Sequence, residues 1–151
     1  PPFMYGATTD FLRMMRVTLR QGRMVNETDT RGSELVVLVN ETMARHLWPG
    51  ESALGKCVRA GYGPGQPLEF DDGNPADNAP CRSVVGVVRD SRARSPRPDG
   101  NEAKYMQFYV PFEQLPMPPI PNYSAINGML VQVAPDANGV TPAIQRAVAG
   151  C

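Results

Sequence analysis

The stretch from Gly50 to Lys56 contains residue types that could bind a nucleotide. Two glycines separated by four residues and followed by lysine almost match the phosphate-binding loop G-x-x-x-x-G-K-[ST]. That loop follows a strand and opens a helix, whose first N–H groups hold the phosphates. Here Pro49 ends a predicted helix just before the loop, and Cys57 stands where a magnesium-binding hydroxyl is needed. The pattern therefore predicts a structural turn, and we expect no cofactor.

Two other polar clusters do not match a specific binding motif. The segment Asp71–Asn78 collects oxygen donors, but it lacks the alternating carboxylates and the later glutamate of a calcium loop. Arg89, Arg92, Arg94 and Arg97 lie close together without interleaved aromatic residues, which favours a solvated turn, with an anionic membrane surface as the alternative. The 15 Lys and Arg residues balance the 15 Asp and Glu residues, so we expect no nucleic-acid partner.

The sequence offers no recognisable catalytic group. His46 is the only histidine and lies on a predicted helix beside Arg45, where an exposed helix residue is the simpler interpretation. No serine lies in a G-x-S-x-G turn, and no carboxylate pair has a useful spacing. We therefore predict no catalytic residues and no enzyme.

Three cysteines occur at positions 57, 81 and 151. No two of them have the C-x-x-C spacing, and with a single histidine they do not predict a metal site. Cys57 and Cys81 could form a disulfide in an oxidising compartment, which would close a loop of about 25 residues and contribute about 3 kcal/mol in the loop-entropy model. Three small buried thiols are the alternative.

The clearest structural pattern is a strand followed by a helix. Residues 34–40 contain a continuous Val-rich apolar run from Leu35 to Val39, typical of a strand that is covered on both faces. Asn40 can cap the next helix, Glu41 suits its first turn, and Pro49 with Gly50 ends it. Four apolar side chains share the helix face that we expect to pack on the sheet, namely Met43, Ala44, Leu47 and Trp48.

The other patterns complete a mixed α/β fold. A helix is predicted to start near Phe11, with Thr8, Thr9 and Asp10 as N-cap candidates, and to give way to extended chain before Gln21. Residues 24–33 are polar and are predicted to form a surface loop. Further strands are predicted at 55–61, 81–90, 104–112 and 128–135, with a long excursion at 61–80 and a final helix at 140–150. Pro142 suits the first turn of that helix, and Ile144 and Val148 should face the core. The order α-β-α-β-β-β-β-α predicts a mixed sheet of about five strands, with strands Val36–Val39 and Val84–Val88 at its centre and helices packed on it.

Length and composition fit a single folded domain. The chain has 151 residues, of which 42% are hydrophobic, enough for one core. It contains no apolar run of the length that spans a membrane and no signal peptide. It begins with Pro1-Pro2 and ends within a predicted helix, so we interpret residues 1–151 as one domain excised from a longer protein.

The motifs taken in order resemble those of the extracytoplasmic core domain of MacB-like, FtsX-type ABC transporter permeases. The stretches that carry the resemblance are "DFLRMMRVTLRQGR", "VVLVNETMARHLWPGESALGK", "SVVGVVRDSR" and "YVPF", between Phe11 and Val148. Two features depart from the family pattern. Ala53 stands where the family usually has proline, and the excursion at 61–80 is longer than usual.

The resemblance implies a non-catalytic domain on the periplasmic or extracellular side of the cell membrane. It would couple the ATP-driven motion of transmembrane helices to export, to extraction or to an envelope partner. The implied partners are the protein's own transmembrane helices, a cytoplasmic ABC ATPase subunit, a second permease copy and an envelope adaptor. The residues that matter would then be those that fasten the helix to the sheet, namely Asn40, Trp48, Pro49, Gly50, Gly55 and Lys56.

Two other functions remain open from the sequence. The long loops at 61–80 and 111–124 would also suit a soluble ligand-binding or sensor module of the cell envelope. An enzyme that uses the Gly50–Lys56 loop would bind ATP. The resemblance favours the permease domain over both.

Overall fold

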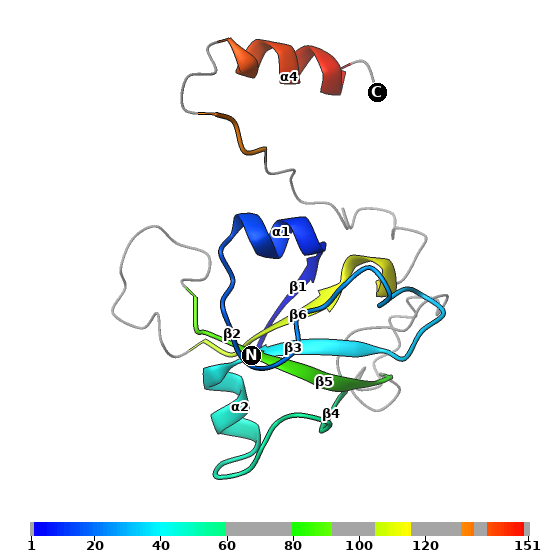
Figure 1. Cartoon of the computed structure of the whole chain (residues 1–151), viewed down its shortest axis with the longest axis vertical. Coiled ribbons are helices and arrows are strands. Elements are labelled where there is room, and N and C mark those ends of the chain that lie inside the picture. The colour runs from blue at the N-terminus through cyan, green and yellow to red at the C-terminus, as the bar shows by residue number, and fades with distance from the viewer. Residues whose placement is uncertain (1, 60–79, 92–104, 116–130, 135–138, 150–151) are drawn as a thin grey trace, which may run out of the picture.

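The computed structural model describes residues 2–59, 80–91, 105–115, 131–134 and 139–149, and its body is a mixed six-stranded sheet (Figure 1). The strands are β1 (Phe3–Ala7), β2 (Leu19–Gly22), β3 (Val36–Asn40), β4 (Cys57–Arg59), β5 (Cys81–Val88) and β6 (Gln107–Pro111). The helices are α1 (Thr9–Met14), α2 (Glu41–Leu47), the 3-10 turn η2 (Phe112–Gln114) and α4 (Val140–Ala149). The fold is thus mixed α/β, as predicted.

The sheet is built around β3, whose five residues are all buried. Its strand order is β1-β6-β3-β5-β2, and β4 pairs with the first residues of β5. β3 runs parallel to β5 and antiparallel to β6, and β1 runs parallel to β6. The predicted central position of the two Val-rich strands is therefore confirmed, and a strand covered on both faces explains the continuous apolar run.

Each face of the sheet has its own hydrophobic cluster, since successive side chains of a strand point to opposite faces. The α2 face is closed by α2 and the chain that follows it, and its buried residues are Val37, Val39, Met43, Ala53, Val58, Val84, Val87, Phe108 and Val110. The α1 face is closed by α1 and residues 23–30, and its buried residues are Ala7, Leu12, Val25, Val36, Leu38, Val88 and Tyr109. Figure 1 shows α1 and α2 on opposite sides of the sheet.

Two strands differ from the sequence prediction. β1 was not predicted, yet it pairs with β6 over five residues, from Phe3 with Gln107 to Ala7 with Pro111. The prediction of a strand at 128–135 is wrong for residues 131–134, the part that the structure describes. These residues form no strand, and the side chains of Val131 and Val133 are both 47% exposed. A strand needs a neighbour to satisfy its backbone. β1 finds one in β6, and residues 131–134 have none among the described strands.

The predicted helices are present, with two corrections to their packing. Leu47 is 43% exposed, so the packing face of α2 consists of Met43, Ala44 and Trp48. The final helix forms over 140–149, but neither core cluster includes Ile144, and the side chain of Val148 lies outside the described residues. The excursion at 61–80 also lies almost entirely outside them. Among the helices that the structure describes, none has the length and apolarity needed to cross a bilayer.

Candidate functional site

The chain from Trp48 to Lys56, which we call the corner, turns the end of α2 back onto the sheet. Pro49 cannot continue the helix because it lacks the backbone N–H that the helical ladder needs. Gly50 has φ 78° and Gly55 has φ 74°, in the left-handed region where glycine carries no steric penalty. These residues therefore provide the two sharp bends of the corner.

The corner is fastened to β5 by the backbone. Gly55 N–H donates to Val84 O at 2.9 Å, and Val84 N–H donates to Lys56 O at 2.9 Å. Between the bends, the Ala53 side chain is 3% exposed within the α2-face cluster, and Trp48 packs against the same cluster. Two backbone hydrogen bonds and two apolar contacts thus join the end of α2 to the centre of the sheet.

The same contacts occupy the amides that a phosphate would need. Four N–H groups of the loop donate within the protein: Glu51 to Trp48 O, Leu54 to Ser52 Oγ, Gly55 to Val84 O, and Lys56 to Ala53 O. Lys56 Nζ lies 2.7 Å from Glu51 Oε2, and this ion pair holds the pKa of Glu51 below its usual value. The loop follows a helix and leads into β4, which is the arrangement of a turn and not of a phosphate cradle.

Asn40 connects three elements at the start of α2. Its side chain is 1% exposed, and Oδ1 accepts from Met43 N–H and from Gln107 N–H, each at 3.0 Å. Its Nδ2 donates to Tyr105 O at 2.9 Å. One buried amide therefore caps α2, as predicted, and also satisfies two backbone groups at the start of β6, which the sequence does not reveal.

A second capping group was missed because its residue is distant in sequence. Asp90 follows β5 and accepts from Thr42 N–H at 2.9 Å and from Thr42 Oγ at 2.8 Å. Arg45 lies 3.3 Å from the same carboxylate. A carboxylate at a helix N-terminus is stabilised by the helix dipole. Asp90 thus ties the start of α2 to the end of β5, so α2 is fixed to this strand at both of its ends.

Cys57 and Cys81 are brought together by the pairing of β4 with β5. Their Cα atoms are 5.5 Å apart, within the usual range for a disulfide, and their sulfur atoms are joined in the structure. Both residues are exposed, in contrast to the alternative of buried thiols. The bond would lie at the base of the 61–80 excursion, directly after the corner.

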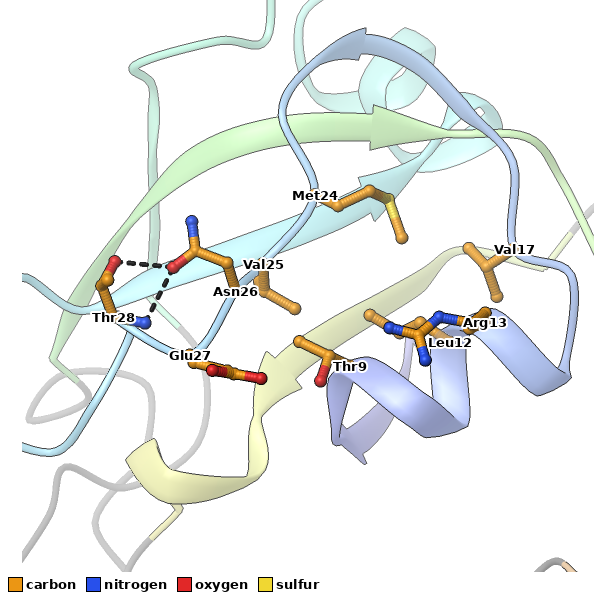
Figure 2. A pocket seen from close by; sticks show the side chains of 9 residues that line it. All are labelled: Thr9, Leu12, Arg13, Val17, Met24, Val25, Asn26, Glu27 and Thr28. Carbon is orange, nitrogen blue, oxygen red and sulfur yellow. Dashed lines mark hydrogen bonds between the residues drawn. The ribbon is translucent and has the colours of Figure 1, made fainter.

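A groove lies on the opposite side of the sheet, between α1 and residues 24–28 (Figure 2). It has a volume of about 610 Å³ and opens next to a second hollow of about 360 Å³ that reaches η2. We call the two together the α1 groove. The residues that line the larger part are Thr9, Leu12, Arg13, Val17, Met24, Val25, Asn26, Glu27 and Thr28. The sequence predicts only a polar surface loop here and gives no sign of a groove.

The wall of the α1 groove is held by an ion pair that the sequence also did not reveal. Arg23 donates from Nη1 and Nη2 to the two carboxylate oxygens of Asp29, each at 2.8 Å, and Asp29 also accepts from Asn26 N–H at 2.9 Å. Asp29 is 5% exposed. The hydrogen bonds from Arg23 lower the pKa of the Asp29 carboxyl and raise that of the guanidinium, so the pair stays charged.

The remaining sequence candidates do not form a reactive site in the described part of the chain. His46 is an exposed residue of α2, as the simpler interpretation holds. Arg89 is exposed, whereas Arg92, Arg94, Arg97 and the acidic segment at 71–78 lie outside the described residues. Within the described ranges, no three His, Cys, Asp or Glu side chains gather in a way that could hold a metal ion.

The comparisons with family models and with curated proteins agree with each other. The family model of the MacB-like periplasmic core domain matches residues 2–148. The chain is 26% identical over 116 residues to the uncharacterized ABC transporter permease YvrN of Bacillus subtilis (strain 168), covering 77% of this chain and 24% of that protein.

The solved structure of a MacB periplasmic region shows the same fold. The periplasmic region of MacB from Actinobacillus actinomycetemcomitans superposes with a TM-score of 0.56 at 19% identity, over 97% of this chain and 56% of that one. The extracellular domain of the noncanonic ABC-type transporter YknZ from Gram-positive bacteria gives a TM-score of 0.44 at 19% identity, over 72% and 42% of the two chains. This chain therefore spans about a quarter of the curated permease and just over half of the MacB region. Because the family model covers nearly all of its residues, the chain belongs to the family of MacB-like periplasmic core domains.

Proposed function

We propose that this chain is the extracytoplasmic domain of an ABC transporter permease and that it works as a mechanical coupler. It lies on the periplasmic or extracellular side of the cell membrane. It carries the motion of the permease's own transmembrane helices, driven by a cytoplasmic ABC ATPase subunit, to export, to extraction or to an envelope partner. A second permease copy and an envelope adaptor are its further partners.

The observation that carries this proposal is the match of the family model over residues 2–148. The similarity to the permease YvrN supports the assignment to a permease. Since the chain spans only a fraction of that relative, the transmembrane helices, the ATPase and the transported substrate are parts of the proposal.

The arrangement of the strands suits the transmission of force. β1 pairs in parallel with β6 over five residues, and β6 pairs with the central β3. A pull along β1 would load these hydrogen bonds together, because they run across the direction of the pull. From β3 the load reaches β5, to which the corner and Asp90 fix α2. Motion applied at β1 can therefore move the sheet and α2 as one body.

We also propose that the domain is not catalytic. The Gly50–Lys56 loop, which resembles a phosphate-binding loop, uses backbone amides to hold the corner in place. The only histidine of the sequence, His46, is exposed on α2, and among the described residues its side chain has no hydrogen-bonding partner. Conformational transmission needs packing and fixed hydrogen bonds rather than a reactive group. Calorimetry with millimolar ATP should therefore show no binding to this chain, and a measurable affinity would contradict this part of the proposal.

The test of the assignment uses the full-length parent protein in intact cells. Leu47, 43% exposed on α2, is replaced by cysteine in a background that lacks Cys151. We expect a membrane-impermeant maleimide to label this cysteine from outside, and we expect apolar segments of about 20 residues on both sides of the domain. A cysteine in the cytoplasmic ATPase is the control that stays unlabelled. Labelling of Leu47→Cys only after lysis would indicate a cytoplasmic location and overturn the assignment. Labelling in intact cells without flanking apolar segments would instead favour a soluble envelope module.

A further inference from the structure

We propose that the α1 groove binds a protein segment that presents an apolar side chain next to lysine or arginine. This inference rests on the proposed function, because such a segment would belong to an envelope partner that the moving domain engages. It assigns a binding surface to the side of the sheet opposite to the corner. The apolar floor, the fixed wall and the unpaired charge of the groove each support it.

The floor of the groove is apolar and belongs to the core. Leu12 is 1% exposed and Val25 is 5% exposed, and both are members of the α1-face cluster. Val17 and Met24 are half-buried and line the same hollow (Figure 2). A hollow of about 610 Å³ lies within the size range of binding pockets. It is large enough for one or two apolar side chains, whose burial would drive binding.

The wall of the groove is fixed before any partner arrives. The bidentate Arg23–Asp29 pair holds the base of the loop. Asn26 Oδ1 accepts from Thr28 N–H at 2.8 Å and from Thr28 Oγ at 2.6 Å, which holds its tip (Figure 2). A wall that is already ordered loses little conformational entropy on binding, so more of the contact energy appears as affinity.

The unpaired charge of the groove is negative. Glu27 lines both hollows and Glu113 lines the smaller one, and in the described part of the chain neither carboxylate has an ion-pair partner. The positive charge of Arg13 is offset by Asp10 at 2.8 Å. Two carboxylates beside an apolar floor attract lysine or arginine, whereas they repel an anionic lipid surface. This charge selects a basic protein segment as the occupant.

The test is a binding experiment with this chain and three synthetic ten-residue peptides. The first alternates leucine with lysine and arginine, the second has glutamate in place of the basic residues, and the third has glycine in place of leucine. Affinity is measured by fluorescence anisotropy, and the site is located by methyl NMR shifts of Leu12, Val17 and Val25. We expect the first peptide to bind at these methyl groups and its two twins to bind at least about tenfold more weakly.

Two matched variants test the role of the carboxylates. Replacing both Glu27 and Glu113 by glutamine should weaken the first peptide about three- to tenfold, since an exposed ion pair contributes up to about a fivefold effect. Glu51→Gln removes an exposed carboxylate from the opposite side of the sheet and should leave the affinity unchanged. None of these three residues is buried, so the variants should fold.

Four results of the peptide experiments would overturn the inference. They are equal binding of the acidic twin, unchanged affinity in the double variant, no binding at about 1 mM peptide, and shifts that map to the corner. NMR contacts between α4 and the groove methyl groups in the free chain would show that α4 occupies the groove. Methyl shifts that depend on protein concentration would show that a second copy of the chain occupies it. Either result would also overturn the inference. Each of these results leaves the proposed function standing, because labelling of the full-length permease tests that function separately.

Discussion

The two faces of the sheet are each closed by one short helix, but by different kinds of contact. On the α2 face, backbone hydrogen bonds between the corner and β5 hold the end of α2, and the buried Asn40 side chain holds its start. On the α1 face, the exposed Thr8 caps α1, and the ion pair of Arg23 with Asp29 holds the neighbouring loop. The first face is closed against the sheet, whereas the second leaves a groove between its helix and its loop.

This difference suggests a division of roles within one small domain. A face held by backbone hydrogen bonds and by the buried Asn40 side chain suits the transmission of force, because these contacts do not depend on exposed side chains. A face that is held by side chains and open at its surface suits recognition. The predictions below test whether the two faces differ in this way.

The largest expected difference is between the two helix caps. Asn40→Ala removes the acceptor of two buried N–H groups and the donor to Tyr105 O, and it should lower the free energy of unfolding by about 4 kcal/mol. Thr8→Ala removes one exposed cap and should cost about 1 kcal/mol. Urea unfolding followed by circular dichroism measures both. Equal losses would contradict the distinction between the faces.

The disulfide proposed for Cys57 and Cys81 should hold β4, the strand that follows the corner, on β5. The sequence separation is 24, so its loss in a Cys57→Ser, Cys81→Ser double variant should cost about 3 kcal/mol. Cys151→Ser is the control and should have no effect on stability. A count of free thiols in the unreduced, denatured protein gives the direct answer: one thiol is expected, and three would show that the bond does not form.

The bends of the corner should tolerate a side chain poorly. Gly55→Ala places a Cβ at φ 74° with no neighbouring atom within 4 Å, so its cost is that of the backbone conformation alone, about 1–2 kcal/mol. Gly32→Ala is the matched control, because Gly32 also has open space around its Cβ position but no positive φ. Thermal unfolding of the two variants should differ by several degrees. A Gly55→Ala variant as stable as Gly32→Ala would show that the bend is not needed.

The smallest effect concerns acid stability on the α1 face. The folded-state pKa of Asp29 is lowered, so its contribution to stability is present above the unfolded-state pKa and is lost as the pH falls through the folded-state pKa. Asp29→Asn should therefore lower the free energy of unfolding at pH 7 by about 1 kcal/mol, a small value because the partner Arg23 is 45% exposed. Below pH 3, the free energies of unfolding of the variant and the wild type should be closer to each other. Urea unfolding at both pH values checks this. A constant difference at both values would show that the lost contact is not ionic.

Sequence patterns predicted those parts of the fold that depend on neighbouring residues. The Val-rich strand, the cap at Asn40 and the break at Pro49 each combine signals within about ten residues, and all three are present. β1 was missed because its five residues include Gly6 and become a strand only through pairing with residues 107–111, about 100 positions away. The strand at 128–135 was predicted from alternation alone, which does not show whether a neighbouring strand exists.

In the candidate site, too, the features that depend on neighbouring residues could be predicted and those that depend on distant residues could not. The corner could be predicted because proline and glycine determine its bends. The Asp90 cap, the three-element contact of Asn40 and the α1 groove arise from residues far apart in sequence, and the types of those residues do not indicate their partners. The Arg23–Asp29 pair is closer, six residues apart, but charged residues in a polar loop more often face the solvent.

The central claim is that the domain moves as one body when the ATPase subunit of the proposed transporter hydrolyses ATP. Spin labels are attached at Met4→Cys on β1 and at Leu47→Cys on α2, two positions with exposed side chains, and the distance between them is measured. The sample is the full-length permease with its ATPase in lipid nanodiscs, in which Cys151 is replaced by serine and only one permease copy is labelled. The distance between the two labels should stay the same with and without ATP. The distance from the Leu47→Cys label to a label on a flanking transmembrane helix should change. A change in the Met4–Leu47 distance on ATP binding, or no motion of the domain relative to the membrane helices, would contradict the account.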